Sequence, residues 1–415
     1  MLKSAPHPLH VPACCAAIAL ERLAWYALLA GLVTWLARFG HSDDRASLIV
    51  GYVVSAAYAA PLLGAQVADR LTGYRLAAVL GALAFAAGYA LMGLSAPIVG
   101  LALVSVGNGL FKPAIMSLLS GASMAGSPER TRDNGRLYAA INVGSLPTGL
   151  VGGYLSAGHS LRFLVLSCAT ALAALVLLAS WRVLRGGEWR SEVEALTQAP
   201  MDHQPSYRAP WLALGALLVG ALAFWSVYNL SYGALVLHAK HAVDRVAFGR
   251  VIPPEWFGSL NPAFIIALTP IVAWFDRPNF AGGRARTRLG SKLVVGMGLV
   301  AFSFVTLSLA PSAHPGWLVL AYGLLSAGEL LVSAAAISAV TSWAPRGQTA
   351  RFLSLYFLTI AAGGWVAGAA VGEVPNLREL FHHSATAAGL GMLWFLLNAG
   401  RFDRQERAVL RGSEG

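Results

Sequence analysis

The sequence predicts an all-α integral membrane protein with twelve membrane-spanning helices arranged as two six-helix halves. Three observations lead to this fold class: the composition, the number of long apolar runs, and a polar segment in the middle of the chain. Hydrophobic residues make up 57% of the 415 positions and charged residues only 12%, and the mean hydropathy is +0.62. A soluble domain carries about 25% charged residues, so we expect lipid to cover much of this surface.

The apolar runs have the length of membrane spans. A helix needs roughly 20 apolar residues, with a range of about 17–25, to cross the hydrocarbon core. Twelve such runs lie near 13–37, 47–68, 76–95, 97–120, 136–157, 161–183, 210–237, 257–276, 291–310, 316–340, 351–371 and 384–400, the last of which is short. Gly and Ala are abundant in them, as expected where helices approach closely in lipid.

The distribution of Lys and Arg predicts the orientation. If both termini are cytoplasmic, the inner segments hold 21 of these residues. The outer segments then hold seven, namely Arg38, Arg45, Arg162, Lys240, Arg245, Arg250 and Arg378. Because cytoplasmic loops are enriched in Lys and Arg, we expect a plasma-membrane (bacterial inner-membrane) protein with both termini in the cytoplasm.

The longest polar segment divides the chain six plus six. We expect an N-terminal six-helix bundle at 1–183, a cytoplasmic linker at 184–209 and a C-terminal six-helix bundle at 210–415. Many transporters consist of two such halves that rock around a substrate site near the middle of the membrane. The layout therefore favours a transporter.

Other classes of protein lack support in the sequence. The formal charge of +11 comes from basic residues that punctuate apolar runs, so we expect no nucleic-acid partner. The cysteines Cys14, Cys15 and Cys168 lie in apolar runs without metal or disulfide spacing. Because no nucleophile–base set, metal-ligand spacing or phosphate-binding loop is present, we expect no enzyme, no metal and no cofactor.

Four charged residues fall deep inside the apolar runs: Glu21, Arg22, Lys112 and Glu329. A lone charge at the bilayer centre costs at least about 2.5–3.5 kcal/mol on insertion scales, so such residues usually face one another or a wet cavity. Two positive and two negative charges balance to zero. A functional site is favoured, and the alternative is two static ion pairs, which seldom stabilise a protein more than apolar packing does.

The first inner segment carries a further pattern. Gly64-Ala-Gln-Val-Ala-Asp69-Arg70-Leu-Thr-Gly73-Tyr-Arg75 follows the second span. It resembles the loop motif of the major facilitator superfamily, in which the Asp accepts from a neighbouring helix N-terminus and the Arg residues form a cytoplasmic gate. The alternative is a positive inner loop with a turn glycine.

Five motifs, in order along the chain, resemble those of proton-dependent oligopeptide transporters, the POT family of that superfamily. Glu21-Arg22-Leu-Ala-Trp25-Tyr26-Ala is similar to the family's Glu-x-x-Glu-Arg-Phe-x-Tyr-Tyr-Gly. The other four are Gly107-Asn108-Gly109-Leu110-Phe111-Lys112-Pro113, Leu137-Tyr138-Ala-Ala-Ile141-Asn142-Val-Gly144, Trp256-Phe-Gly-Ser-Leu-Asn261-Pro262 and Gly328-Glu329-Leu330.

The resemblance implies a fold, a substrate and a set of site residues. It implies the major facilitator fold and secondary transport of small peptides or peptide-like solutes, driven by a proton gradient. Arg22, Tyr26 and Lys112 are then expected near the substrate carboxylate, and Glu329 and Asn261 near its ammonium, with Asn142 close by. Tyr58 and Tyr356 are expected to line side-chain pockets, although core packing is an equal alternative for Tyr58. We expect a monomer whose partners are the peptide and lipid.

Three positions depart from the family pattern. Ile18, Leu29 and Asn229 stand where the family has Glu, Arg and Glu, residues tied to proton coupling and to an outer gate pair. A proton carrier must change charge as its surroundings change, so we expect protons to pass through Glu21 or Glu329, with weaker coupling.

Two further expectations concern the buried charges and the direction of transport. Because consecutive helical residues diverge by about 100°, we expect another helix to supply the partner of Glu21, with Lys112 the main candidate. The alternatives to peptide uptake are an exporter of a drug or peptide-like natural product and a receptor that no longer transports.

Overall fold

The computed structural model describes residues 7–120, 122, 128–154, 159–184, 211–247, 249–275, 288–344, 349–374 and 376–412. Most of these residues are helical, as the composition predicts. The elements of the first part are α1 (His10–Arg38), α2 (Asp43–Val67), η1 (Ala68–Thr72), α3 (Gly73–Gly93), α4 (Pro97–Ser120), α5 (Pro128–Ser145), α6 (Thr148–Tyr154) and α7 (His159–Ala179). The elements of the second part are α9 (Trp211–Tyr228), η3 (Asn229–Tyr232), α10 (Ala234–His241), β1 (Val246–Ala247), β2 (Arg250–Val251), η4 (Pro254–Ser259), α11 (Leu260–Phe275), α12 (Leu289–Ser308), α13 (Pro315–Trp343), α14 (Thr349–Ala370) and α15 (Leu377–Gly412).

Among the described residues, each of the twelve predicted runs overlaps at least one helix. Nine helical stretches among the described residues are long and apolar enough to cross a membrane. One of them, Asp43–Gly93, covers two predicted spans because η1 joins α2 to α3 without a break. The predicted spans at 136–157 and 257–276 fall outside the nine, since the first is divided into α5 and α6 and the second forms η4 and the 16-residue α11. The count of twelve therefore stays a prediction.

The chain forms two compact units. Unit 1 contains Met1–Trp35 and Ala56–Ala195, and unit 2 contains Leu36–Ser55 and Leu196–Gly415. The first half of α2 therefore clusters with C-terminal helices. The predicted halves, in contrast, place all of α2 in the N-terminal bundle at 1–183. The linker prediction for 184–209 lies outside the described residues except at Leu184.

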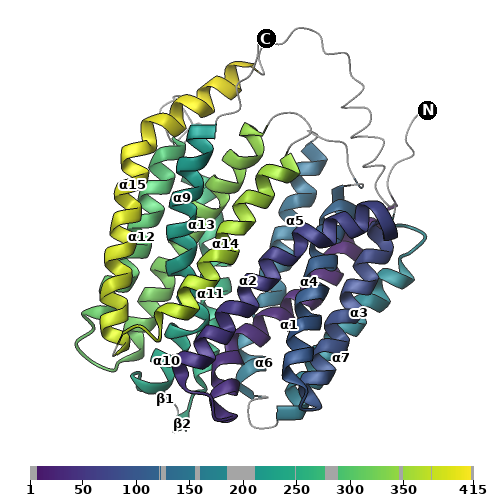
Figure 1. Cartoon of the computed structure of the whole chain (residues 1–415). Helices are drawn as coiled ribbons and strands as arrows, with labels where there is room; N and C mark the ends of the chain where they lie inside the picture. Colours follow the sequence, from purple (N-terminus) through teal and green to yellow (C-terminus); the bar gives the residue numbers. More distant parts are fainter. Residues whose placement is uncertain are drawn as a thin grey trace. The chain divides into compact units, whose positions relative to one another are not determined.

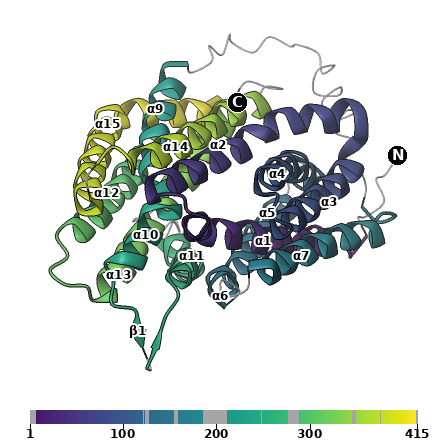
Figure 2. The ribbon, with the colours of Figure 1, turned by 60° about the horizontal axis from the view of Figure 1, so that its bottom comes forward.

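Within unit 1, α3 packs along both α4 and α7 (Figure 2). Glycines allow the α3–α4 approach, because a Cβ on Gly81 would lie 2.6 Å from the amide nitrogen of Phe111, and one on Gly88 would lie 2.7 Å from the Gly100 carbonyl oxygen. Small residues at helix contacts are the usual means of close packing in lipid.

Within unit 2, α12 packs against α13 and α15, and α9 packs against α14 and α15 (Figure 1). Gly296 and Gly328 bring α12 and α13 together, since a Cβ on Gly328 would lie 2.6 Å from the Gly296 carbonyl oxygen. This contact fixes α13 one residue before Glu329, the membrane carboxylate predicted for the second half.

Candidate functional site

A cluster of polar side chains lies in unit 1, where α1, α2 and α4 meet. This basic cluster is defined as Glu21, Arg22 and Tyr26 of α1, Tyr58 of α2, and Asn108 and Lys112 of α4. The fold thus brings Arg22, Tyr26 and Lys112, which the motifs predicted for carboxylate binding, together with Tyr58, which was predicted to line a side-chain pocket.

An ion pair between neighbouring residues forms the buried part of the basic cluster. Arg22 Nε donates to Glu21 Oε2 at 2.5 Å, and Arg22 Nη2 donates to Glu21 Oε1 at 2.6 Å. The two residues are 3% and 0% exposed. The expectation that another helix supplies the partner of Glu21 is therefore wrong. Two long side chains curve toward each other from diverging Cα–Cβ bonds, and the planar guanidinium then matches both carboxylate oxygens.

Asn108 connects the ion pair to two other helices, a function that the sequence did not reveal. Its Oδ1 accepts from Arg22 Nη2 at 3.0 Å, and its Nδ2 donates to the carbonyl oxygen of Ala57 on α2. The available signal was its position inside Gly107-Asn108-Gly109, where glycines on both sides let another helix come close. A Cβ on Gly64 of α2 would lie only 2.0 Å from the Gly109 carbonyl oxygen.

Aromatic rings cover the cations of the cluster. Lys112 Nζ lies 4.4 Å from the centroid of the Tyr58 ring, and the Arg22 guanidinium lies 5.7 Å from that of Tyr26. Such contacts are favourable for a cation, more so when it is desolvated. With ordinary charge states, Glu21 cancels Arg22 and the cluster keeps one formal positive charge, that of Lys112.

Asn142 lies in the same unit on α5. Its Nδ2 donates to the carbonyl oxygen of Tyr138 at 2.9 Å, one turn earlier in its own helix. The helix comes close to α1 at Gly144, where a Cβ would lie 2.2 Å from the Ala19 carbonyl oxygen. The substrate contact of Asn142 stays a prediction.

Arg162, which the sequence places in an outer segment, is a buried cation like Arg22. It lies in the first turn of α7 and is 2% exposed. Its guanidinium donates to the carbonyl oxygens of Ala27 at 2.6 Å, Leu28 at 3.3 Å and Gly31 at 3.4 Å, all on α1. The guanidinium of Arg162 fits there because Gly31 has no side chain. A Cβ on Gly31 would lie 2.3 Å from the guanidinium nitrogens. Sequence counting missed this burial because Arg162 stands at the end of an apolar run.

Unit 2 contains one carboxylate predicted for substrate binding, Glu329 of α13. Its Oε2 accepts from the hydroxyl of Tyr228 at 2.7 Å and from Asn261 Nδ2 at 2.8 Å. Asn261 also donates to Ser326 Oγ at 3.0 Å. Among the described residues both donors to Glu329 are neutral, so they orient the carboxylate without cancelling its charge. The fold thus joins Asn261 and Glu329, as expected, and adds Tyr228.

Tyr356, predicted to line a side-chain pocket, is almost completely buried in α14. Trp225 Nε1 donates to its hydroxyl at 3.2 Å, and the two rings meet edge to face with centroids 6.4 Å apart. Asn229, which follows this part of α9, donates through Nδ2 to the Ile360 carbonyl oxygen at 3.4 Å. These residues form a packed aromatic wall beside Tyr228, whose ring centroid lies 5.2 Å from that of Trp225.

The sequence matches the models of two known protein families. The model of the Major Facilitator Superfamily matches residues 14–276, more than half of the chain. The chain belongs to this superfamily. The model of the POT family matches residues 211–383, in agreement with the motifs that predicted it.

Relatives and solved structures agree with this membership. The dipeptide and tripeptide permeases A of Chromobacterium violaceum and Proteus mirabilis are both 26% identical, over 90% and 88% of this chain and 88% and 86% of their own lengths. A POT peptide transporter solved with sulfate matches with a TM-score of 0.84 at 22% identity, over 96% of both chains. A POT family transporter solved with 5-aminolevulinic acid matches with a TM-score of 0.85 at 20% identity, over 95% of this chain and 97% of its own. The predicted major facilitator fold is therefore confirmed.

The major facilitator loop motif spans the end of α2, η1 and the start of α3, with a turn at Gly73. The carboxylate of Asp69 in η1 accepts from the hydroxyl of Tyr74 in the first turn of α3, and Arg70 is exposed. Arg75 Nη1 donates to the Trp181 carbonyl oxygen at 3.2 Å, and its guanidinium lies over the Trp181 ring at 5.9 Å. Gly73, with φ of +71°, makes the turn between η1 and α3. The predicted gating function of Asp69, Arg70 and Arg75 stays a prediction.

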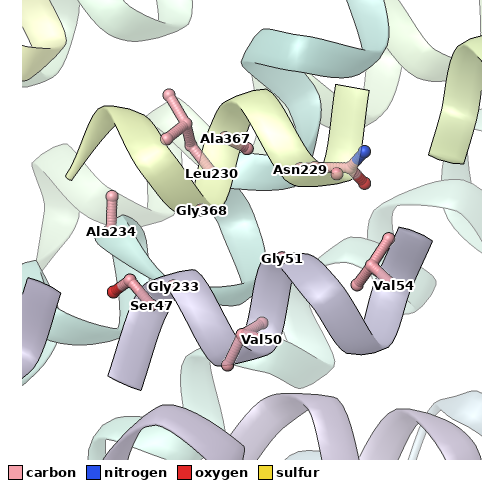
Figure 3. Close-up of a pocket in the computed structure, with 11 residues that line it drawn as sticks. Ser47, Val50, Gly51, Val54, Asn229, Leu230, Gly233, Ala234, Ala367 and Gly368 are labelled. Carbon is pink, nitrogen blue, oxygen red and sulfur yellow. The ribbon is translucent and has the colours of Figure 1, made fainter. Parts of the chain in front are cut away.

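Unit 2 of this major facilitator protein also contains a small pocket, of about 10 Å³, where α2, η3, α10 and α14 meet. Figure 3 shows Val50, Gly51 and Val54 on α2 opposite Ala367 and Gly368 on α14. The remaining lining residues are Ser47, Asn229, Leu230, Gly233, Ala234 and Gly364. The small side chains at this contact allow two helix backbones to touch.

Proposed function

We propose that this chain is a secondary active transporter that moves small peptides or peptide-like solutes across the bacterial inner membrane by alternating access. The observation that carries the proposal is that the basic cluster of unit 1 and the Glu329 carboxylate of unit 2 have opposite charges. The basic cluster has one net positive charge, and the carboxylate of Glu329 is held by neutral donors. The names of the relatives, dipeptide and tripeptide permeases, support the same substrate class.

The basic cluster binds the substrate carboxylate in this proposal. Lys112 supplies the charge that an incoming carboxylate meets, beside the ion pair of Arg22 with both oxygens of Glu21. Its position over the Tyr58 ring, at 4.4 Å, orients the ammonium group. A hydrogen bond to a charged group contributes about 1.5–3 kcal/mol, which is enough to separate a free acid from an amide.

Glu329 binds the substrate ammonium. Tyr228 and Asn261 both donate to Oε2, and among the described residues no donor reaches Oε1. The donors therefore hold the carboxylate in one orientation and leave Oε1 for a cation. The side chain keeps partial exposure, as binding of a solute requires.

Proton coupling, driven by the membrane proton gradient without a cofactor, passes through Glu329 in preference to Glu21. Protonation of Glu21 would break a bidentate ion pair and leave Arg22 charged and buried. Loss of one partner of a buried ion pair costs about 3–5 kcal/mol. Protonation of Glu329 breaks no ion pair among the described residues. With Ile18, Leu29 and Asn229 at the other family positions, coupling is weaker than in proteins with the full set.

The orientation follows from the basic residues. Both termini lie in the cytoplasm, because the Lys and Arg excess then falls on inner segments. The protein acts as a monomer whose cargo is the peptide.

Uptake in proteoliposomes tests the proposal. Dialanine and trialanine uptake is measured with an inward proton gradient, without a gradient, and as exchange against internal dialanine. We expect exchange in wild type and its loss in Glu329→Gln, with Glu373→Gln, an exposed acid of the same unit, as the matched control. Wild-type protein that is inserted and folded but exchanges neither peptide would refute the proposal. Accumulation only with the gradient reversed would favour the exporter.

A further inference from the structure

The last helix, α15, is longer than a membrane is thick. Its 36 residues, Leu377–Gly412, form the longest helix among the described residues (Figure 1). At 1.5 Å per residue such a helix extends about 54 Å, whereas the hydrocarbon core is about 30 Å thick. The predicted span at 384–400 ends where the sequence becomes charged. We therefore expect the part of α15 from Arg401 onward to lie at or beyond the lipid headgroups.

This helix has one exposed face, which is apolar before residue 400 and basic after it. Leu390, Leu393 and Leu397 are 63%, 47% and 74% exposed, as expected of side chains that face lipid tails. Successive helical residues are about 100° apart, so Arg401 and Arg404 lie within about 40° of Leu397 around the helix. Both arginines are exposed. The lipid-facing side of α15 therefore changes from leucine to arginine within about one turn.

The opposite side of this part of α15 is packed against α12 and α13. The amide nitrogen of Gly290, in the first turn of α12, donates to Asp403 Oδ1 at 2.9 Å. The buried ring of Phe402 stacks on Trp343 of α13, with centroids 6.1 Å apart. Asp403 and Glu406 are both at least about 100° around the helix from either arginine. Among the described residues, accordingly, neither arginine forms a salt bridge.

The two guanidinium groups are held at the same level along the helix. Arg401 Nη1 donates to Asn398 Oδ1 at 2.5 Å. Asn398 is 8% exposed, and its Nδ2 donates to the Trp394 carbonyl oxygen at 2.9 Å, which fixes its amide. Arg404 Nη1 lies 3.5 Å from the position that a Cβ on Gly400 would take. Both side chains therefore point back by about one turn, toward the end of the leucine face.

We propose that Arg401 and Arg404 bind the phosphodiester of an anionic phospholipid in the cytoplasmic leaflet, with an acyl chain along Leu397 and Leu393. Paired N–H donors of guanidinium groups match phosphate oxygens, and an anionic membrane surface attracts arginines next to a span. A net negative lipid is favoured because no acid of the described chain neutralises the two arginines, whereas a zwitterionic headgroup adds its own cation. The orientation given under the proposed function selects the leaflet, but the binding itself requires neither peptide nor transport.

Native mass spectrometry of the full-length protein in detergent tests the proposal. Equal amounts of phosphatidylglycerol and phosphatidylcholine with identical acyl chains are offered, and the ratio of the two bound lipids is measured. An arginine near an anionic surface strengthens binding about fivefold, so the double variant Arg401→Gln, Arg404→Gln should decrease this ratio about 10- to 30-fold. The matched control is Arg45→Gln, Arg250→Gln, which removes two exposed arginines of the predicted outer segments of the same unit and should leave the ratio unchanged.

A charge-retaining variant and a soluble competitor complete the test. Arg401→Lys, Arg404→Lys keeps both charges without the paired donors, so it should lose less of the preference than the glutamine pair. Inorganic phosphate should leave phosphatidylglycerol bound, because it lacks the acyl chain that lies along the leucines.

Four results would overturn the proposal. They are equal binding of both lipids by wild type, an equal decrease in the control pair, a lysine pair no better than the glutamine pair, and complete displacement of the lipid by inorganic phosphate, which would indicate a site for free anions. No peptide is present in these measurements, so failure here is distinguishable from failure of the proposed transport function.

Discussion

Replacing Gly64 by Ala should separate α2 from α4 and disrupt the basic cluster. A Cβ at this position would lie 2.0 Å from the carbonyl oxygen and 2.3 Å from the carbonyl carbon of Gly109. Ordinary van der Waals contact begins near 3.4 Å. Because both atoms of Gly109 belong to the backbone and cannot rotate away, α2 or α4 must move by about 1 Å. That movement breaks the Asn108–Ala57 hydrogen bond and moves Lys112 away from Tyr58.

The magnitude follows from two contributions. Overpacking costs about 1–3 kcal/mol, and a lost hydrogen bond costs about 0.5–1.5 kcal/mol. Their sum, roughly 1.5–4.5 kcal/mol, corresponds to a decrease in Tm of roughly 3–18 °C for a unit of this size.

Thermal unfolding in detergent, with and without dialanine, measures both effects. Gly135→Ala is the matched control in unit 1, because a Cβ there meets no atom within 4 Å and alanine favours an exposed helix by about 1 kcal/mol. Gly64→Ala should unfold at a lower temperature and lose the stabilisation by dialanine. If the two variants unfold at the same temperature and respond equally to dialanine, the reasoning about the α2–α4 contact is refuted.

Three further variants probe the other contacts. Gly31→Ala should push the Arg162 guanidinium off the α1 carbonyls and lower Tm, and an unchanged Tm would show that these bonds contribute nothing. Asn108→Leu should destabilise by about 1.5–3 kcal/mol, because it removes a hydrogen bond to the charged Arg22; Tm in detergent checks this value. Asp43→Asn, which removes the ion pair between Asp43 Oδ1 and Lys240 Nζ at 3.6 Å, should lower Tm by an amount equivalent to at most about 1 kcal/mol at low salt, with a smaller difference at 1 M salt, and an effect independent of salt would contradict an ionic contact.

The membrane helices were predictable because their signal is local. Each apolar run contains within itself the length and hydropathy that lipid demands, so each of the twelve overlaps helix among the described residues. The sequence did not reveal that the run at 136–157 is divided, that α15 extends to 36 residues, or that the first half of α2 packs with C-terminal helices. These outcomes depend on which surfaces meet, for example where Gly51 and Gly368 let two backbones touch.

The sequence alone determined the fold class and the superfamily, and it identified Glu21, Arg22, Lys112 and Glu329 as charges inside apolar runs, because hydropathy and motif spacing are properties of consecutive residues. Only the tertiary structure decided their pairing. Glu21 takes its own neighbour Arg22, Glu329 is held by Tyr228 as well as by Asn261, and Arg162 binds the carbonyls of α1. The physical reason is that a buried carboxylate needs a donor, and a buried guanidinium an acceptor, within about 3 Å, and residues far apart in the chain come that close only when helices are packed.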